Sequence, residues 1–124
     1  MFLRNFFLAL FFTVFFAGLV FAGPSVTSST HSNSDTWYKN NAPVFEVESG
    51  GAGYSFAFDA LPDTVPDEVS DSSNPTISFS NKASGVFYFH VRMRKAGSWS
   101  DTAHFKLQID TDGPTTATGL KAEF

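Results

Sequence analysis

The sequence contains no cysteine. This absence excludes a disulfide framework, which a secreted domain would otherwise be free to form, and it excludes a lipid-anchored start at a cysteine. The chain also lacks an Asn-x-Ser/Thr acceptor for glycosylation. The folded domain must therefore draw its stability from its core or from a bound ion.

Positive charge is scarce. The chain has 8 basic and 12 acidic residues, and residues 23–124 hold 7 of the basic and all 12 of the acidic ones, a net charge of −5. Nucleic-acid phosphates require a basic stripe on the protein, and anionic membrane surfaces also attract basic residues. The composition therefore argues against nucleic acid and against an anionic membrane surface as partners.

Catalytic signatures are also missing. The sequence has no nucleophile elbow, no metalloprotease helix motif and no phosphate-binding loop. Its glycine-rich run at residues 49–53 precedes a strand pattern, so it has no helix N-terminus to direct at phosphate. Residues 23–124 with one sandwich core leave little room for a substrate cleft. The sequence therefore predicts a protein that is not an enzyme.

The chain begins with an apolar segment. Arg4 is followed by a run from residue 6 to residue 22 that is interrupted only by one threonine and one glycine. Val20 and Ala22 are small or modest residues at the two positions that a signal peptidase reads. We predict that residues 1–22 are a cleaved signal peptide and that the protein is secreted or exposed at the cell surface. The alternative is an uncleaved anchor, since 17 mostly apolar residues reach the lower limit of a bilayer span; membrane contact would then be confined to this segment.

Residues 85–94 are the most strand-like stretch of the sequence. Their side chains alternate between an apolar and a mainly polar side, which is the pattern of a half-buried strand. A strand of this length needs partners that cover its apolar side. The apolar side holds Phe87, Phe89, Val91 and Met93, and the other side holds Tyr88, His90, Arg92 and Arg94.

Similar short patterns recur along the chain, separated by turn signals, and no stretch of residues 23–124 has the period of a helix. We therefore predict an all-β fold, a two-sheet antiparallel β-sandwich of six or seven strands that follows the hydrophobic signal segment. The further strands are expected at residues 26–30, 44–48, 54–58, 76–80 and 103–110, with one short edge strand near residues 65–69. The side chains expected between the sheets are Phe45, Val47, Tyr54, Phe56, Phe58, Ile77, Phe79, Phe87, Phe89, Val91, Phe105, Leu107 and Ile109.

These patterns divide the rest of the chain into three parts. Residues 23–35 form a Ser/Thr-rich lead, residues 36–112 form the sandwich, and residues 113–124 form a linker or a truncated tail.

The strand motifs resemble those of fibronectin type III and bacterial immunoglobulin-like modules. The resemblance covers residues 36–112 and implies a module of a bacterial surface or secreted protein, used in tandem as a spacer, an adhesive unit or an accessory domain. It implies no single function, because one sandwich fold hosts many roles. The motifs that carry it are Phe45-x-Val47, Tyr54-x-Phe56-x-Phe58, Gly85-x-Phe87-x-Phe89-x-Val91-x-Met93, and Gly97-Ser98-Trp99-Ser100 before a last alternating strand.

Two positions depart from the family pattern. Val47 stands where members usually carry a tryptophan, and Phe87 stands where they carry a tyrosine. The hydroxyl of that tyrosine ties down the corner before the sixth strand, and Phe87 cannot form this hydrogen bond. The run from Asp112 to Thr115 looks like the start of a linker to a further module.

Candidate calcium ligands gather in one acidic stretch and at the end of the last strand. Carboxylate oxygens are ligands that Ca²⁺ prefers, so calcium is the one cofactor that the sequence suggests. The alternative is a set of solvated loop acids, because EF-hand spacing is absent. The candidate ligands are Asp59, Asp63, Asp67, Asp110 and Asp112, with Glu68 and Asp71 in the same acidic stretch.

Two histidines fall on the solvent-facing side of strands that should be neighbours. His90 and His104 could form a cross-strand pair, or a Zn²⁺ site with a third ligand such as His31. The alternative is that both are simply exposed strand residues.

Three aromatic residues are candidates for ligand binding. Trp37, Tyr38 and Trp99 could stack on a sugar ring if they were exposed, and otherwise they pack on the edge of the sandwich. We therefore expect a non-enzymatic structural or adhesive module whose partners are other surface modules or proteins, and the alternative is a carbohydrate-binding module.

Overall fold

The computed structural model describes residues 21–112, so that most of the predicted signal peptide (residues 1–22) and the predicted tail (residues 113–124) lie outside the described residues. Within them the chain forms eight strands, more than the six or seven predicted, and no helix. The strands are β1 (Val26–Ser28), β2 (Trp37–Tyr38), β3 (Val44–Val47), β4 (Gly53–Asp59), β5 (Thr76–Ser78), β6 (Gly85–Lys95), β7 (Ser98–Trp99) and β8 (Ala103–Ile109).

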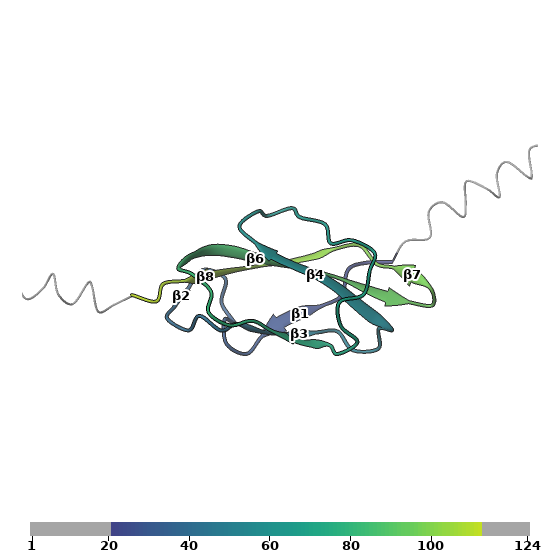
Figure 1. Cartoon of the computed structure of the whole chain (residues 1–124), viewed down its shortest axis with the longest axis horizontal. Helices are drawn as coiled ribbons and strands as arrows, with labels where there is room; N and C mark the ends of the chain where they lie inside the picture. Colours follow the sequence, from purple (N-terminus) through teal and green to yellow (C-terminus); the bar gives the residue numbers. More distant parts are fainter. Residues whose placement is uncertain (1–20, 113–124) are drawn as a thin grey trace, which may run out of the picture.

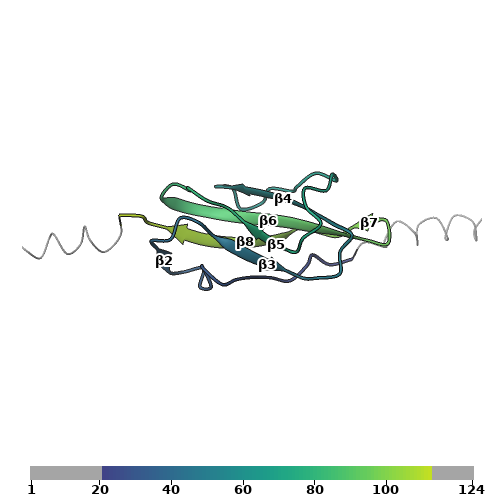
Figure 2. The same ribbon diagram turned by 60° about the horizontal axis from the view of Figure 1, so that its bottom comes forward.

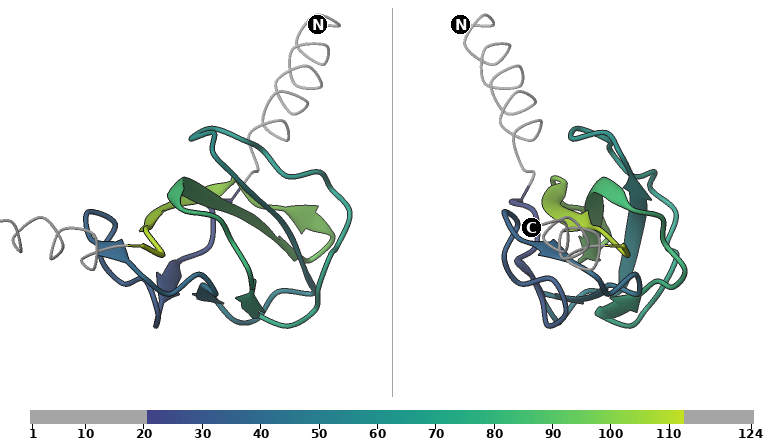
Figure 3. Two further views of the ribbon diagram at one scale, coloured as in Figure 1. Left: turned by 60° about the vertical axis from the view of Figure 1, so that its left-hand side comes forward. Right: turned by 90° about the vertical axis from the view of Figure 1, so that its left-hand side faces the viewer.

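The strands make two sheets that lie face to face (Figures 2 and 3). The three-stranded sheet has the order β1-β3-β5, and the five-stranded sheet has the order β2-β8-β6-β4, with β7 paired to the end of β6. This confirms the predicted all-β, two-sheet architecture. The antiparallel prediction holds for every pair except one, because β2 runs parallel to β8.

β6 is the central strand, as its alternation predicts. It pairs in register with β4 on one side and with β8 on the other, along seven positions each. Phe89, Val91 and Met93 are buried between the sheets, and the alternate side chains lie on the opposite face. The strand extends to Lys95, one residue further than predicted.

The core is built around two stacked phenylalanines. The rings of Phe45 on β3 and Phe89 on β6 lie 4.1 Å apart and are almost parallel, so they join the two sheets at the centre. Five predicted core phenylalanines are only partly buried and pack against the buried centre. The buried set is Phe45, Val47, Tyr54, Ile77, Phe89, Val91, Met93, Leu107 and Ile109, and the partly buried ones are Phe56, Phe58, Phe79, Phe87 and Phe105.

Two predicted strands are two residues shorter in the structure, for reasons of hydrogen bonding, while β3 and β8 are each one residue shorter. β1 ends at Ser28 because hydroxyl groups replace the ladder there: Ser28 Oγ donates to the Val44 carbonyl, and Thr30 Oγ1 accepts from the Val44 N–H. Just before β5, the Pro75 carbonyl accepts from the Val47 N–H, and just after β5, the Phe79 N–H donates to the Pro43 carbonyl. Neither proline has an N–H with which to continue the ladder.

The predicted edge strand at residues 65–69 does not form. Residues 60–75, called the connection below, instead run back along β4 and cover its open edge. Tyr54 N–H donates to the Ser72 carbonyl, and Phe56 N–H donates to Asp71 Oδ2, so these donors of the edge are satisfied within the chain. On the other sheet Asn74 Oδ1 accepts the Thr76 N–H at the edge of β5. Covered edges of this kind resist pairing with other chains.

The hairpin between β6 and β7 contains a strained residue. Its two loop residues, Ala96 and Gly97, both have positive φ angles, 52° and 80°. Such turns favour Asn-Gly, because asparagine and glycine tolerate the left-handed region better than alanine does.

We predict that Ala96→Asn stabilises the protein by roughly 1 kcal/mol, since it relieves this strain. The midpoint of a thermal melt should rise by about 4–8 °C. Ala60→Asn is the control, because Ala60 is also exposed but has no positive φ. An equal or lower melting temperature for Ala96→Asn would contradict the prediction.

Candidate functional site

The polar side chains of the molecule gather on the outer face of the five-stranded sheet, the face turned away from the core. The connection packs across this face beside β4 and β6 (Figure 1). Pro66 is buried there, and Ser55 Oγ donates to Asp67 Oδ1 at 3.0 Å. A strand pattern alone would leave Ser55 on a wet face, yet it is completely buried. Hydrogen bonds therefore fix the connection to this face, although most of its side chains are exposed.

Arg92 on β6 fastens the connection to the sheet. Its Nη1 donates to the Pro66 carbonyl at 3.2 Å and its Nη2 to Glu68 at 3.2 Å, while its Nε donates to the Ser100 carbonyl at 3.0 Å. One guanidinium thus joins the connection to the segment after β7. Planar guanidinium donors suit such a junction because several bonds form from one fixed fork.

Next to Arg92 on the same face, three side chains form a hydrogen-bonded row across three strands. Asp59 Oδ1 on β4 accepts from His90 Nε2 at 2.9 Å, and His90 Nδ1 lies 2.7 Å from His104 Nδ1 on β8. The two histidines are direct cross-strand partners, so the pair, one of the alternatives left open by the sequence, forms, and His90 is not the exposed strand residue of the other alternative.

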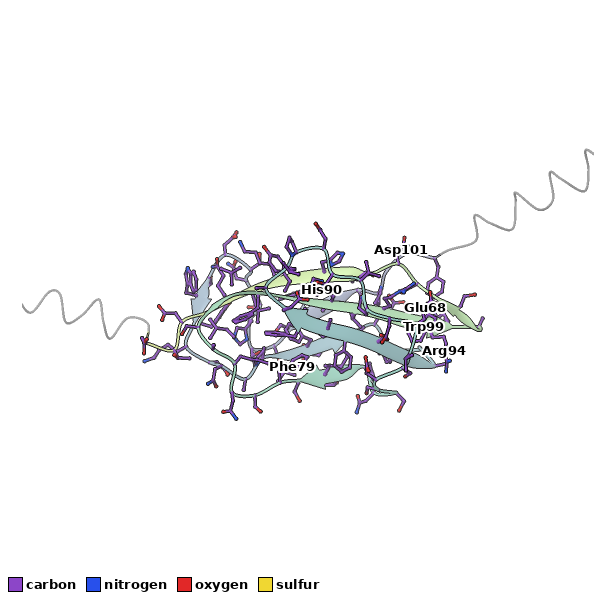
Figure 4. The ribbon with its side chains drawn as sticks, turned by 45° about the horizontal axis from the view of Figure 1, so that its top comes forward. Glu68, Phe79, His90, Arg94, Trp99 and Asp101 are labelled. Atoms are coloured by element: carbon purple, nitrogen blue, oxygen red, sulfur yellow. The ribbon has the colours of Figure 1, made fainter. Side chains whose placement is uncertain are left out.

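His90 is not the exposed residue that its position on the strand suggests. It is completely buried, whereas His104 is exposed to solvent (His90 is labelled in Figure 4). Burial of an imidazole requires hydrogen-bonding partners, and Asp59 and His104 supply one for each ring nitrogen.

Asp59 is held as a carboxylate by its donors. Partial burial raises the pKa of Asp59, but hydrogen bonds from the Thr64 hydroxyl, His90 and the Leu61 N–H outweigh burial and hold the pKa below its ordinary value. The Asp59 carboxylate therefore serves both the histidine row and the first turn of the connection.

The predicted calcium ligands do not converge. Asp67 accepts from Ser55 and from the Val69 N–H, and Asp110 Oδ1 accepts from the Asp112 N–H. Among residues 21–112, no group of three or more His, Asp or Glu side chains is placed to hold a metal ion. Calcium binding stays a prediction, and the arrangement of these carboxylates adds no support to it.

The three candidate aromatics lie at two ends of the sandwich. Trp37 and Tyr38 are level with residues 108 and 109 of β8, whereas Trp99 pairs with Arg94 near the far end of β6. Trp37 is 53% exposed. Trp99 is half-buried under the Arg94 guanidinium, and both lie at the right-hand end of the molecule in Figure 4. The two ends are separated by roughly 30 Å at ~3.4 Å per residue, so the three residues do not form one face.

The third histidine lies apart from this row. His31 is buried; its Nε2 is 2.8 Å from the Asn40 carbonyl and its Nδ1 is 2.8 Å from the Thr30 hydroxyl, while its ring packs on Tyr38. It closes the loop between β1 and β3 and does not join His90 and His104 as a third ligand.

Other concave or apolar surface is limited. A shallow hollow is lined by Leu61, Pro62, Asp63 and Thr64 at the start of the connection. Apart from Trp37, the large apolar side chains that are exposed in the described part of the chain are Leu61, Val65 and Val69, all on the connection.

The sequence gives no local sign of several residues that matter here. Ser55, Thr64 and Pro66 carry no motif, and their roles depend on the path of the connection. The strand pattern placed Arg92 on the outer face, but it did not predict the hydrogen bonds that Arg92 makes to the connection and to the segment after β7.

No protein-family model matches the chain, and comparisons with curated proteins and with solved structures give no match either. Within residues 21–112 there is no helix long and apolar enough to cross a membrane.

We predict that the stability of the protein decreases as the pH is lowered, because of His31. Burial lowers the pKa of His31, against an opposing contribution from its bond to Asn40, so the unfolded chain binds a proton more readily than the folded one. Stability is then fully present above the ordinary histidine pKa of about 6.5 and is lost as the pH falls below it. Urea melts between pH 7.5 and 5 should show this loss, and His31→Gln should reduce its slope by up to ~1.4 kcal/mol per pH unit. An unchanged slope in His31→Gln would contradict the assignment.

We predict that Arg92→Met destabilises the protein by about 1–3 kcal/mol, because it leaves the Pro66 and Ser100 carbonyls without their donor. Amide hydrogen exchange of residues 66–70 should become faster. Arg94→Met is the matched control, since the exposed Arg94 only stacks on Trp99 and should cost less than about 1 kcal/mol. Equal effects of the two substitutions would show that Arg92 does not fasten the connection.

Proposed function

We propose that the protein is a non-enzymatic structural or adhesive β-sandwich module of a secreted or cell-surface protein. The observation that supports this most is that the chain enters and leaves the sandwich at opposite ends of its long axis (Figure 1). At one end the Ser25 carbonyl accepts from the Glu48 N–H, and at the other the Thr111 N–H donates to Ser84 Oγ. Ends placed in this way let a module extend an array and carry a pull along it.

The strands nearest to the two ends are oriented to resist such a pull. β1 and β8 both run from the entry end toward the exit end, antiparallel to β3 and β6 respectively. Tension between the ends therefore slides each strand along its neighbour, and the ladder hydrogen bonds bear the load together. The parallel pair of β2 with β8 adds a further contact at the exit end.

We further propose that the sandwich is immunoglobulin-like. In chain order β1, β3, β4, β5, β6 and β8 correspond to the strands A, B, C, E, F and G of that fold, which has A, B and E in one sheet and C, F and G in the other. In chain order the connection stands where strand D would, but it runs along the edge of β4, in the other sheet. This correspondence supports the resemblance in the strand motifs.

The proposed export and the proposed partners rest on features of the sequence. The pattern of residues 1–22 supports export, and the acidic balance supports protein partners over nucleic acid. Other surface modules or surface proteins are therefore the proposed partners. Glycan binding is the weaker alternative, since Trp37 is the one strongly exposed ring among its three candidate residues in the described chain.

Single-molecule pulling tests the load-bearing function. The chain has no cysteine of its own, so Ser25→Cys and Asp112→Cys provide unique handles at the two ends. We expect a distinct force peak that releases roughly 300 Å of contour, at ~3.5 Å per residue.

The matched control keeps Asp112→Cys and moves the other handle to Ala83→Cys. Because these handles lie at neighbouring ends of β6 and β8, the pull opens that pair one bond at a time. The end-to-end pull should need the higher force. If it gives no peak, or a peak no higher than that of the control, the load-bearing proposal is rejected.

A further inference from the structure

The two imidazoles of the histidine row face each other through equivalent nitrogens. Nδ1 of His90 and Nδ1 of His104 are 2.7 Å apart, and the ring planes are tilted by 78°. Two acceptor nitrogens at this distance repel each other unless a hydrogen atom or a metal ion lies between them. In the metal-free protein one of the two rings carries a hydrogen on its Nδ1 and donates it to the other.

The tautomer of His90 follows from Asp59. The Asp59 carboxylate can only accept, so His90 Nε2 carries the hydrogen of the 2.9 Å bond. The neutral His90 ring then has its lone pair on Nδ1, directed at His104, and the shared hydrogen belongs to His104. A histidine whose far nitrogen donates to a carboxylate and whose near nitrogen has a free lone pair is the arrangement found at metal ligands.

We propose that His90 and His104 bind one divalent late transition-metal ion through their two Nδ1 atoms, with the ion replacing the shared proton. His104 supplies its lone pair by moving its hydrogen to Nε2, which can be hydrated because this side chain is exposed. Asp59 acts as a positioning residue that holds the His90 ring and balances part of the charge. Water completes the coordination.

The chemistry of the ligands selects the class of ion. Two imidazoles suit Cu²⁺, Ni²⁺ and Zn²⁺, and Cu²⁺ binds tightest in this series. A site with two protein ligands is weaker than a structural zinc site with four. The ion reaches the pair from the side of His104, since His90 is buried. The other ionisable groups of this face are Tyr88, Arg92 and Arg94 on β6, Lys106 on β8, and Asp67 and Glu68 on the connection.

Copper titration of the whole chain at pH 7.5 tests the site. We expect saturation at one ion per chain, an EPR spectrum with hyperfine coupling to two imidazole nitrogens, and a melting temperature that rises with free Cu²⁺. Zn²⁺ should compete for the same site. Binding should weaken in acid, because protons compete for both nitrogens.

Three variants separate this site from other binding. His104→Ala, and His104→Gln as a second version, should lower the affinity at least tenfold and remove one nitrogen coupling while the fold survives, because His104 is exposed. Asp59→Asn should keep both couplings but weaken binding by about 10–100-fold. Lys106→Ala, on the same strand and face, is the control and should bind as the unsubstituted chain does.

Two results would overturn the proposal. One is a spectrum without coupling to two imidazoles at saturation. The other is an unchanged affinity in both His104 variants, which would place the copper elsewhere and leave the histidine pair as a hydrogen bond only.

Discussion

The stack of Phe45 on Phe89 is the contact on which the rest of the structure depends. It is the point where the centre strands of both sheets meet, with the two rings 4.1 Å apart and both side chains fully buried. Phe45 also contacts Phe58, Phe79 and Phe105. A domain without disulfides must gain its stability by excluding water from such a centre. Ordering the backbone consumes most of the free energy gained in this way. The positions of both sheets follow from this contact.

The outer face of the five-stranded sheet is a second, polar centre. Arg92 and Asp59 both hydrogen-bond to the connection, which contains three prolines. These bonds make the connection part of the fold. Within the described chain, no buried side-chain nitrogen or oxygen lacks a partner. A network that is completely satisfied can be buried at little cost, and it specifies one path for the connection.

The two centres underlie different proposed properties of the molecule: the aromatic core its mechanical role, and the polar outer face its chemistry. The aromatic core and the strands that run between the two ends support the proposed role as a module under load. The ionisable groups lie on the outer face, where His90 and His104 face each other beside Asp59. Metal at this pair would tie β6 to β8 across the sheet, so the two proposals act on the same strand pair but depend on different side chains.

Local pattern determined the fold class, the central strand and the side of the sheet on which each of its residues lies, because side-chain direction in a strand depends only on period. It therefore placed His90 and His104 on the outer face of neighbouring strands and left open whether they pair or are simply exposed. It did not predict the burial of His90, the bond from Asp59, or the parallel pairing of β2. These depend on contacts between residues far apart in the chain, such as the 31 positions between Asp59 and His90. The acidic stretch covers the sheet, and His90 is buried beside it, only because of the path that the connection takes in the tertiary structure.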